Sequence, residues 1–493
     1  MSTVTVCNNG IKCSFEFKSG ENLLQFLASH GFGIAAPCGG HGICGKCTVE
    51  LIENGEKQKV KACSTVLSKD CEVILPESSG NISWNDAQKK HISDGEKSGF
   101  GAAVDLGTTT VAVSLLNLAS GERIGTLSRW NAQKAYGADV ISRAGYCAEH
   151  ADGLEILSGA VRNQILEMLG ELCEMNGIGA EDVNEIFLAG NTVMQHIFAD
   201  ISPVSIASAP FTPETCFDTG ERFELRGIPV NLAPCVAGYV GGDITAGALS
   251  TGLAEKSGLS LFIDVGTNGE MLLGDRSGLT ACAVASGPAF EGAGISCGMP
   301  AENGAIFSAE LTEEGLSYEV VGGGESRGIC GSGLLDLAAC LLELGYIDES
   351  GRLEEDENGD SVFHLTDDVF INQKDIRQLQ LAKAAVAAGI KLIMQARGVE
   401  FEDIQALYLA GGFGNRLRPE SAVKIGMLPE ELLGRIKTVG NSSLAGAEQA
   451  LLSTDSRKKL AEIKSKCEYI ELSSHEGFND AFVCEMQFKE GDS

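Results

Sequence analysis

The chain is poor in basic residues and lacks long apolar runs. Lysine and arginine number 37 against 68 aspartates and glutamates, which gives the 493 residues a formal net charge of −31. A charge of this sign repels nucleic-acid backbones and anionic membrane surfaces, so neither is expected as a partner. The first thirty residues show no secretory signal, and no apolar run suggests a membrane span. We therefore expect a soluble, cytoplasmic protein.

The chain is too long for a single hydrophobic core, and its 44% hydrophobic content can fill more than one. Residues 1–79 hold short alternating segments, Asn-Gly turns and one helical stretch, an order that suits a β-grasp fold. Residues 80–99 are polar and turn-rich, which indicates a linker. Beyond the linker, apolar segments alternate with amphipathic ones, which is typical of an α/β domain.

The α/β region repeats itself, and the repeated segments occur in the same order. The repetition predicts two related halves, residues 100–250 and 251–493. The matched pairs are AAVDLGTTTVAV (102–113) with LFIDVGTNGEML (261–272), and FLAGN (187–191) with LYLAGGFGN (407–415).

Seventeen cysteines are spread along the chain, which disfavours the disulfide framework of a small secreted protein. Cys38, Cys44, Cys47 and Cys63 differ, because three of them crowd one glycine-rich loop. Thiolates hold iron in tetrahedral sulfur sites, and glycines let the backbone wrap closely around a cluster. The spacing is one residue longer in its first gap than the plant-type ferredoxin pattern. These four cysteines are therefore the predicted ligands of an iron–sulfur cluster.

Zinc is the alternative for the same cysteines, although zinc sites usually come as two short CxxC knuckles. Other cysteines lie among apolar neighbours and are expected to be plain buried thiols. These are Cys147, Cys173, Cys340 and Cys484. The arrangement CGGHGICGKC with the later ACS resembles adrenodoxin-like and plant-like [2Fe–2S] ferredoxins over about the first 80 residues.

Two turns between apolar strands suit phosphate binding, because glycine admits a tight turn and backbone N–H groups with hydroxyls can cradle an anion. The first turn predicts nucleotide contacts for Asp105, Gly107, Thr108, Thr109 and Thr110, with Asp105 holding magnesium through water. The second repeats the design with Asp264, Gly266, Thr267 and Asn268.

A glycine-rich turn after the strand ALYLA offers a surface for adenosine. Its candidate residues are Gly411, Gly412, Phe413 and Gly414. Hydrolysis also needs a group that orients the attacking water, and Glu270 and Asp243 are the candidates. In order and spacing, DLGTTT, DVGTNGE and LAGGFG resemble the motifs of the acetate-kinase/sugar-kinase/Hsp70/actin superfamily. That resemblance implies a duplicated ribonuclease-H-like ATPase fold from about residue 100 onward.

The whole architecture resembles the reductive activators of corrinoid-dependent enzymes, as do VASGPAFEGAGIS (284–296), RGICGSGL (327–334) and LAGGFGNRL (409–417). The resemblance implies ATP-dependent transfer of one electron from a [2Fe–2S] cluster to Co(II) corrinoid, giving Co(I). It also implies an external low-potential donor, a corrinoid protein of a methyltransferase or demethylase system as partner, and a homodimer. Compared with longer members, a middle domain is expected to be missing, and the C-terminus has no CxxCxxC motif.

Two other functions remain open at this stage. One is a small-molecule kinase with a redox-sensing ferredoxin domain, although no segment has a pattern that indicates a sugar-binding site. The other is a redox-responsive module in which ATP is bound but not hydrolysed. ATP turnover and the identity of the phosphate acceptor distinguish the three.

Overall fold

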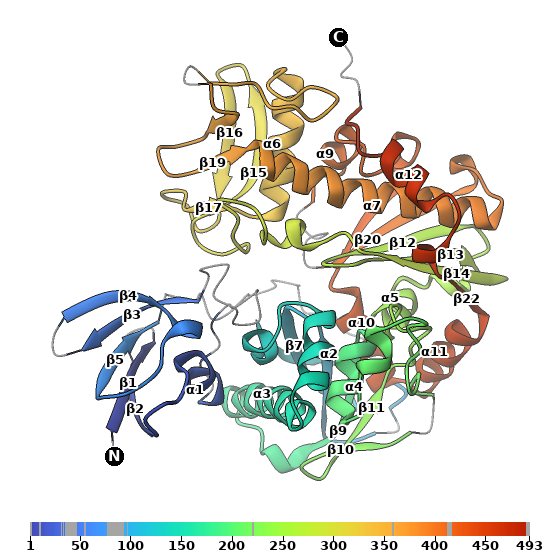
Figure 1. Cartoon of the computed structure of the whole chain (residues 1–493). Coiled ribbons are helices and arrows are strands. Elements are labelled where there is room, and N and C mark those ends of the chain that lie inside the picture. The colour runs from blue at the N-terminus through green and yellow to red at the C-terminus, as the bar shows by residue number, and fades with distance from the viewer. Residues whose placement is uncertain are drawn as a thin grey trace. The chain divides into compact units, whose positions relative to one another are not determined.

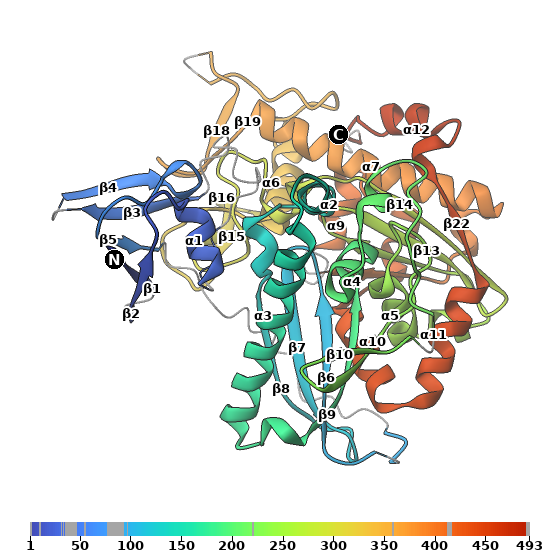
Figure 2. The same cartoon turned by 60° about the horizontal axis from the view of Figure 1, so that its bottom comes forward.

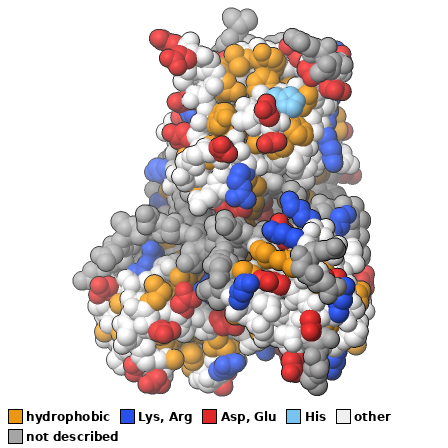
Figure 3. Space-filling view, turned by 90° about the vertical axis from the view of Figure 1, so that its left-hand side faces the viewer, with side chains coloured by type: hydrophobic (Ala, Val, Ile, Leu, Met, Phe, Trp, Pro, Cys, Tyr) orange, Lys and Arg blue, Asp and Glu red, His pale blue; other side chains and the backbone are white. Residues whose placement is uncertain are grey.

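The protein divides into two compact units, Met1–Asp243 with Ala447–Arg457 and Ile244–Gly446 with Lys458–Ser493. Acidic side chains are scattered over the face shown in Figure 3, with basic side chains between them. The computed structural model describes residues 2–8, 11–30, 32, 34, 47–53, 56–75, 93–95, 97–218, 221–356, 359–411 and 417–489.

The N-terminal part of the chain forms a five-stranded sheet with one helix (Figure 1). β1 pairs in parallel with β5, and the other neighbours are antiparallel. Val4 and Val6 are buried while Thr3 and Thr5 are partly exposed, which is the period-2 alternation of a strand with one face on a core. This arrangement confirms the expected β-grasp fold. In the order β2-β1-β5-β3-β4 the strands are Ile11–Phe17, Ser2–Asn8, Cys71–Ile74, Thr48–Glu53 and Glu56–Lys61, and the helix α1 is Leu23–Ser29.

The remainder of the first unit contains a six-stranded mixed sheet in the order β10-β11-β9-β6-β7-β8. β6, β7 and β8 form an antiparallel meander, while β9 and β11 run parallel to β6. The long helix α3 lies against β7 and β8 (Figure 2). The strands β6 to β11 are Phe100–Leu106, Thr110–Asn117, Arg123–Trp130, Val183–Gly190, Phe223–Leu225 and Ile228–Leu232; the helices α2 to α4 are Val140–Glu149, Gly153–Asn176 and Thr192–Ala199. Helix α5, Gly242–Thr251, begins at the end of this part of the first unit and belongs mostly to the second.

Five strands of the second unit repeat this topology in a sheet of order β21-β20-β12-β13-β14-β22, whereas the sixth strand lies at the opposite edge, β10 beside β11 and β22 beside β14. β12, β13 and β14 form the meander, and β20 and β21 run parallel to β12. The repeated sequence segments therefore occupy equivalent strands, β6 with β12 and β9 with β20, which confirms the duplicated fold. The strands are Ser260–Val265, Gly269–Asp275, Gly278–Val284, Ala406–Ala410, Ile436–Gly440 and Cys467–Ile470 for β12, β13, β14, β20, β21 and β22.

Two small sheets and several helices complete the second unit. Contrary to the sequence analysis, one helix among the described residues, α7, has the length and apolar composition of a membrane span. Because 78% of that stretch is buried, we assign α7 to the core of the unit. The remaining strands, β15 to β19, are Ala305–Thr312, Gly315–Val320, Gly328–Ile329, Val362–His364 and Phe370–Asn372; the helices α6, α7, α9 and α12 are Gly331–Glu343, Gln373–Arg397, Pro419–Lys424 and Phe478–Cys484. The helices α10, Ser442–Leu452, and α11, Thr454–Lys466, are shared between the units, because residues 447–457 belong to the first.

Candidate functional site

Two of the four predicted cluster ligands lie next to each other in the ferredoxin domain. The Sγ atoms of Cys47 and Cys63 are 3.2 Å apart, and both thiols are free of disulfides. The Ala62 N–H donates to the Cys47 carbonyl at 2.9 Å, and the Asn22 amide donates to the Cys63 carbonyl at 2.9 Å. These bonds hold the two cysteine-bearing segments together.

A pair of neighbouring thiols suits iron, because soft sulfur ligands are what an iron–sulfur cluster takes. Cys38 and Cys44 lie outside the described residues. In the part of the chain that the structure describes, no three His, Cys, Asp or Glu side chains gather as a metal site. The four-cysteine ligand set therefore stays a prediction, and the closeness of the Cys47 and Cys63 thiols is consistent with it.

The backbone carbonyls of the first phosphate loop, residues 107–110, accept hydrogen bonds from residues outside the loop. The Asn131 side chain donates to the Gly107 carbonyl at 2.8 Å, and the Asn131 N–H donates to the Thr109 carbonyl at 2.9 Å. Nη2 of Arg143 donates to the carbonyl of Thr108 at 2.5 Å. In a trans peptide the N–H points opposite to the carbonyl, so the N–H groups of Thr108 and Thr109 face away from this scaffold. This orientation suits contact with an anion.

Arg143 is fully buried beneath this loop. Its guanidinium also donates to the Gly137 carbonyl at 3.1 Å and to Oε1 of Gln133 at 3.1 Å. Burying a charge is costly unless it is hydrogen-bonded, and here backbone and amide oxygens satisfy it. A fixed positive charge beside the loop favours the binding of an anion there, as the prediction of a phosphate site requires.

The second phosphate loop, residues 266–269, is held in the same manner by different residues. The Ser286 hydroxyl reaches the carbonyls of Gly266 at 3.0 Å and Thr267 at 3.2 Å. The Gly287 N–H also donates to the Thr267 carbonyl, at 3.0 Å. The N–H groups of Thr267 and Asn268 thus face away from this support. The two loops are thus supported alike, and their binding of phosphate remains a prediction.

Asp105 and Asp264 occupy equivalent places near the ends of β6 and β12. Carboxylates at these places suit magnesium, which prefers oxygen ligands and keeps several waters. Gly411 begins the predicted adenosine turn with φ of +92°, and a Cβ there would lie 2.6 Å from Oδ1 of Asp264. Only glycine fits so close to the second phosphate loop. The other candidates of this turn, Gly412, Phe413 and Gly414, lie outside the described residues.

The two candidates for orienting water are placed differently. Glu270 on β13 is the direct cross-strand partner of Asp264, so the two carboxyl side chains lie on one face of the sheet. Asp243 lies in the first turn of α5. Their catalytic roles remain predictions.

Two further residues bond to the loops, Asn191 to the Thr108 hydroxyl and Glu291 to the Thr267 hydroxyl. Sequence reasoning missed all the residues that support the loops, namely Asn131, Arg143, Asn191, Ser286 and Glu291. A signal existed for Asn191, because an asparagine between an apolar strand and a helix is a typical N-cap. No local pattern marks Arg143, which reaches Thr108 from 35 positions away.

The scattered cysteines were expected to be buried. Cys173 and Cys340 are buried and Cys147 is partly buried, but Cys484 is exposed, so the expectation was wrong there. On α12 the rings of Phe478 and Phe482 stack on one face, and Cys484 falls on another. Burial raises the pKa of the Cys147 and Cys340 thiols to about 11.

These features define an iron–sulfur protein that carries an ATPase fold of the actin/Hsp70/sugar-kinase type. Three family models match the chain. They are the 2Fe-2S iron-sulfur cluster binding domain at residues 6–68, the RACo middle region at 100–256, and the C-terminal domain of RACo, the ASKHA domain, at 258–493.

The solved structure of a reductive activator for corrinoid, iron-sulfur protein superposes with a TM-score of 0.72 at 32% identity, covering 99% of this chain and 98% of that one. The corrinoid activation enzyme RamQ of Eubacterium limosum is 29% identical over 95% of this chain and 97% of its own length. The [Co(II) methylated amine-specific corrinoid protein] reductase of Methanosarcina barkeri is 24% identical over 79% and 77%. The chain belongs to the family of reductive activators of corrinoid proteins.

The expectation of a missing middle domain is wrong. The model of the RACo middle region matches residues 100–256, which carry the first phosphate loop. Because its sequence segments repeat those of the second half, this region was interpreted only as half of an ATPase.

Proposed function

We propose that the protein uses ATP to drive one electron from its [2Fe–2S] cluster to the Co(II) corrinoid of a partner protein, which gives Co(I). The observation that supports this proposal is the presence, in one chain, of the adjacent thiols of Cys47 and Cys63 and of two glycine-containing loops whose carbonyls accept hydrogen bonds from their surroundings. The names of the relatives support the same reaction.

An energy source is needed because the transfer runs uphill. Plant-type clusters have potentials near about −400 mV. For one electron, each roughly 59 mV uphill costs about 1.4 kcal/mol. Nucleotide binding and hydrolysis can shift conformational populations by several kcal/mol. This free energy is enough to move an electron to an acceptor whose reduction potential is tens of millivolts lower than that of the cluster.

The finer parts of the proposal concern ligands, partners and location. Cys38, Cys44, Cys47 and Cys63 hold the cluster, and Asp105 with Asp264 holds magnesium through water. An external low-potential donor reduces the cluster. The acceptor is a corrinoid protein of a methyltransferase or demethylase system. The protein acts in the cytoplasm as a homodimer through its ATPase domain.

The test is anaerobic ATP turnover by the cluster-loaded protein, with and without a Co(II) corrinoid protein, while the Co(I) absorbance band is followed. ATP-dependent growth of that band supports the proposal. Reduction that proceeds equally well without nucleotide overturns the coupling. A Cys63→Ala variant is the matched control, since we expect it to lose electron transfer while its phosphate loops stay intact.

The alternatives give different outcomes in the same assay. A kinase places the γ-phosphate on a small acceptor and forms no Co(I). A binding module that only holds ATP shows no turnover. Phosphate analysis alongside the absorbance trace separates these results.

A further inference from the structure

The two phosphate loops are related by duplication, yet their threonine hydroxyls are bonded in opposite senses. Thr108 Oγ1 accepts a hydrogen bond from Nδ2 of Asn191 at 2.9 Å. Thr267 Oγ1 donates its proton to Oε1 of Glu291 at 2.6 Å. A hydroxyl has one proton to donate and two lone pairs to accept with. The two threonines therefore offer different groups to a nucleotide.

This difference decides what each hydroxyl can bind. Thr108 keeps its proton for a phosphate oxygen, which is only an acceptor at neutral pH. The proton of Thr267 is already given to a carboxylate, so its oxygen presents lone pairs. A group that donates, such as a water molecule, fits Thr267, whereas a bare phosphate oxygen does not.

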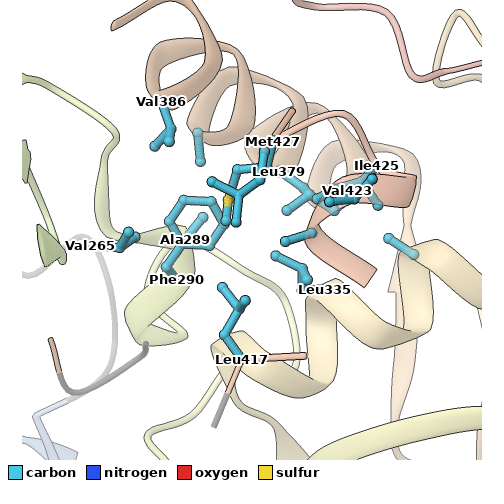
Figure 4. Packing of buried hydrophobic residues seen from close by; sticks show 14 of the residues in the cluster. Val265, Ala289, Phe290, Leu335, Leu379, Val386, Leu417, Val423, Ile425 and Met427 are labelled. Carbon is cyan, nitrogen blue, oxygen red and sulfur yellow. The ribbon is translucent and has the colours of Figure 1, made fainter. Parts of the chain in front are cut away.

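Glu291 is held firmly in place by its neighbours in the sequence. It ends the short turn Pro288–Glu291, whose Ala289 and Phe290 are 3% and 2% exposed. Figure 4 shows both side chains in the packed cluster that also contains Val265, the residue before the second phosphate loop. The same core thus anchors the carboxylate and the loop that it contacts, which fixes the geometry of the bond.

We propose that Glu291 is the positioning residue for hydrolysis and acts through Thr267, whose hydroxyl oxygen accepts a hydrogen bond from the attacking water. This inference rests on the proposed function and gives the water-orienting role to Glu291 instead of Glu270 or Asp243. Thr108, its counterpart, binds phosphate and takes no part in activating water.

The chemistry balances within these groups. The water oxygen bonds to the γ-phosphorus while the bond from that phosphorus to the bridging oxygen breaks, and its electron pair leaves with ADP. The water proton passes to Thr267 as the hydroxyl proton passes to Glu291, from which solvent removes it. The products are ADP, phosphate and one proton.

The experiment compares Glu291→Gln, Thr267→Val, Thr267→Ser and Thr108→Val in the full-length, cluster-loaded protein. ATP affinity is measured by titration and kcat by phosphate release. We expect Glu291→Gln and Thr267→Val to lower kcat about a hundredfold with ATP affinity changed less than about threefold, which is the usual size of a lost proton-transfer group. Thr267→Ser, which keeps the hydroxyl, retains activity within about threefold of wild type on the same ground.

Thr108→Val is the matched control in the duplicated loop. We expect about tenfold weaker ATP binding with kcat changed far less, because only a hydrogen bond to a charged phosphate is lost. The double variant of Glu291→Gln with Thr267→Val should be no slower than either single variant, since the two groups act as one unit. Equal changes in affinity and kcat for Thr267→Val and Thr108→Val would overturn the inference. If the wild type itself shows no ATP turnover, the proposed function fails instead.

Discussion

The Asn191 side chain bridges the start of α4 and the first phosphate loop. Its Nδ2 atom donates to the Thr108 hydroxyl at 2.9 Å, and its Oδ1 atom accepts the Met194 N–H at 3.0 Å. The second bond fixes which end of the amide faces Thr108, because only the oxygen can accept the helix N–H. The N-cap of one helix thereby sets the direction of a hydrogen bond in the nucleotide site.

An Asn191→Asp substitution tests this relationship. Aspartate caps a helix as well as asparagine does, so α4 should keep its stability. The new carboxylate accepts the Thr108 proton and repels phosphate, and we expect ATP binding to weaken by about 1.5–3 kcal/mol. Titration with ATP measures the affinity, and thermal unfolding supplies the control. Unchanged affinity would show that Thr108 does not donate to the nucleotide.

The cluster ligands give a second prediction. A Cys63→Ala variant should lose the visible absorption of the [2Fe–2S] centre and most of its iron, because three thiolates cannot complete two tetrahedral irons. Cys13→Ala, on strand β2 of the same domain, serves as the control and should keep both. Full iron content in Cys63→Ala contradicts the predicted ligand set.

A buried ion pair in the first unit gives a third prediction. Nη2 of Arg123 on β8 lies 2.5 Å from Oε2 of Glu448 on α10, and the carboxylate side chain is fully buried. Removing one partner of such a pair leaves an uncompensated charge and costs about 3–5 kcal/mol. We therefore expect Arg123→Met alone to lower the free energy of unfolding by this amount.

The control for this pair is the double variant of Arg123→Met with Glu448→Leu. Replacing both partners by apolar side chains should recover most of the loss. Urea unfolding of Arg123→Met, Glu448→Leu and the double variant against wild type measures the coupling. A double variant as unstable as the single one would place the cost in lost packing rather than in the orphaned charge.

Lys383 on α7 makes the free energy of unfolding depend on pH. Its ammonium donates to the Gln487 carbonyl, and burial lowers its pKa to about 8, with Lys489 and Lys391 adding to the effect and Glu485 opposing it. Above the folded pKa the unfolded chain binds more protons, so this residue's contribution to stability rises with pH between about 8 and 10.5.

Lys383→Met removes this titration while keeping the apolar stem. The free energy of unfolding of wild type minus that of the variant should rise by roughly 1–3 kcal/mol between pH 8 and 10. Taking the difference cancels the opposite slope from buried cysteine thiols, which both proteins share. A difference that stays flat with pH would contradict the lowered pKa.

Much of the fold was predictable because its signals are local. Alternation along β1 and the repeated strand-turn segments each follow from a few adjacent residues. The roles of Arg143 and Glu291 were not predictable, since each residue contacts a loop that lies far from it in the sequence. Cys484 was misassigned because apolar neighbours in sequence do not say which face of a helix a residue takes.

Burial of the scattered thiols has a consequence for the delivery of iron. Burial raises the pKa of Cys71 to about 11 and that of Cys467 to about 12, and it raises those of Cys235 and Cys282 further. A protonated, enclosed thiol is a poor ligand, because metals bind the thiolate. These four thiols are therefore weak competitors for the iron that the ferredoxin domain takes up. Iron can therefore reach the cysteines of the ferredoxin domain selectively, although the chain contains many other cysteines.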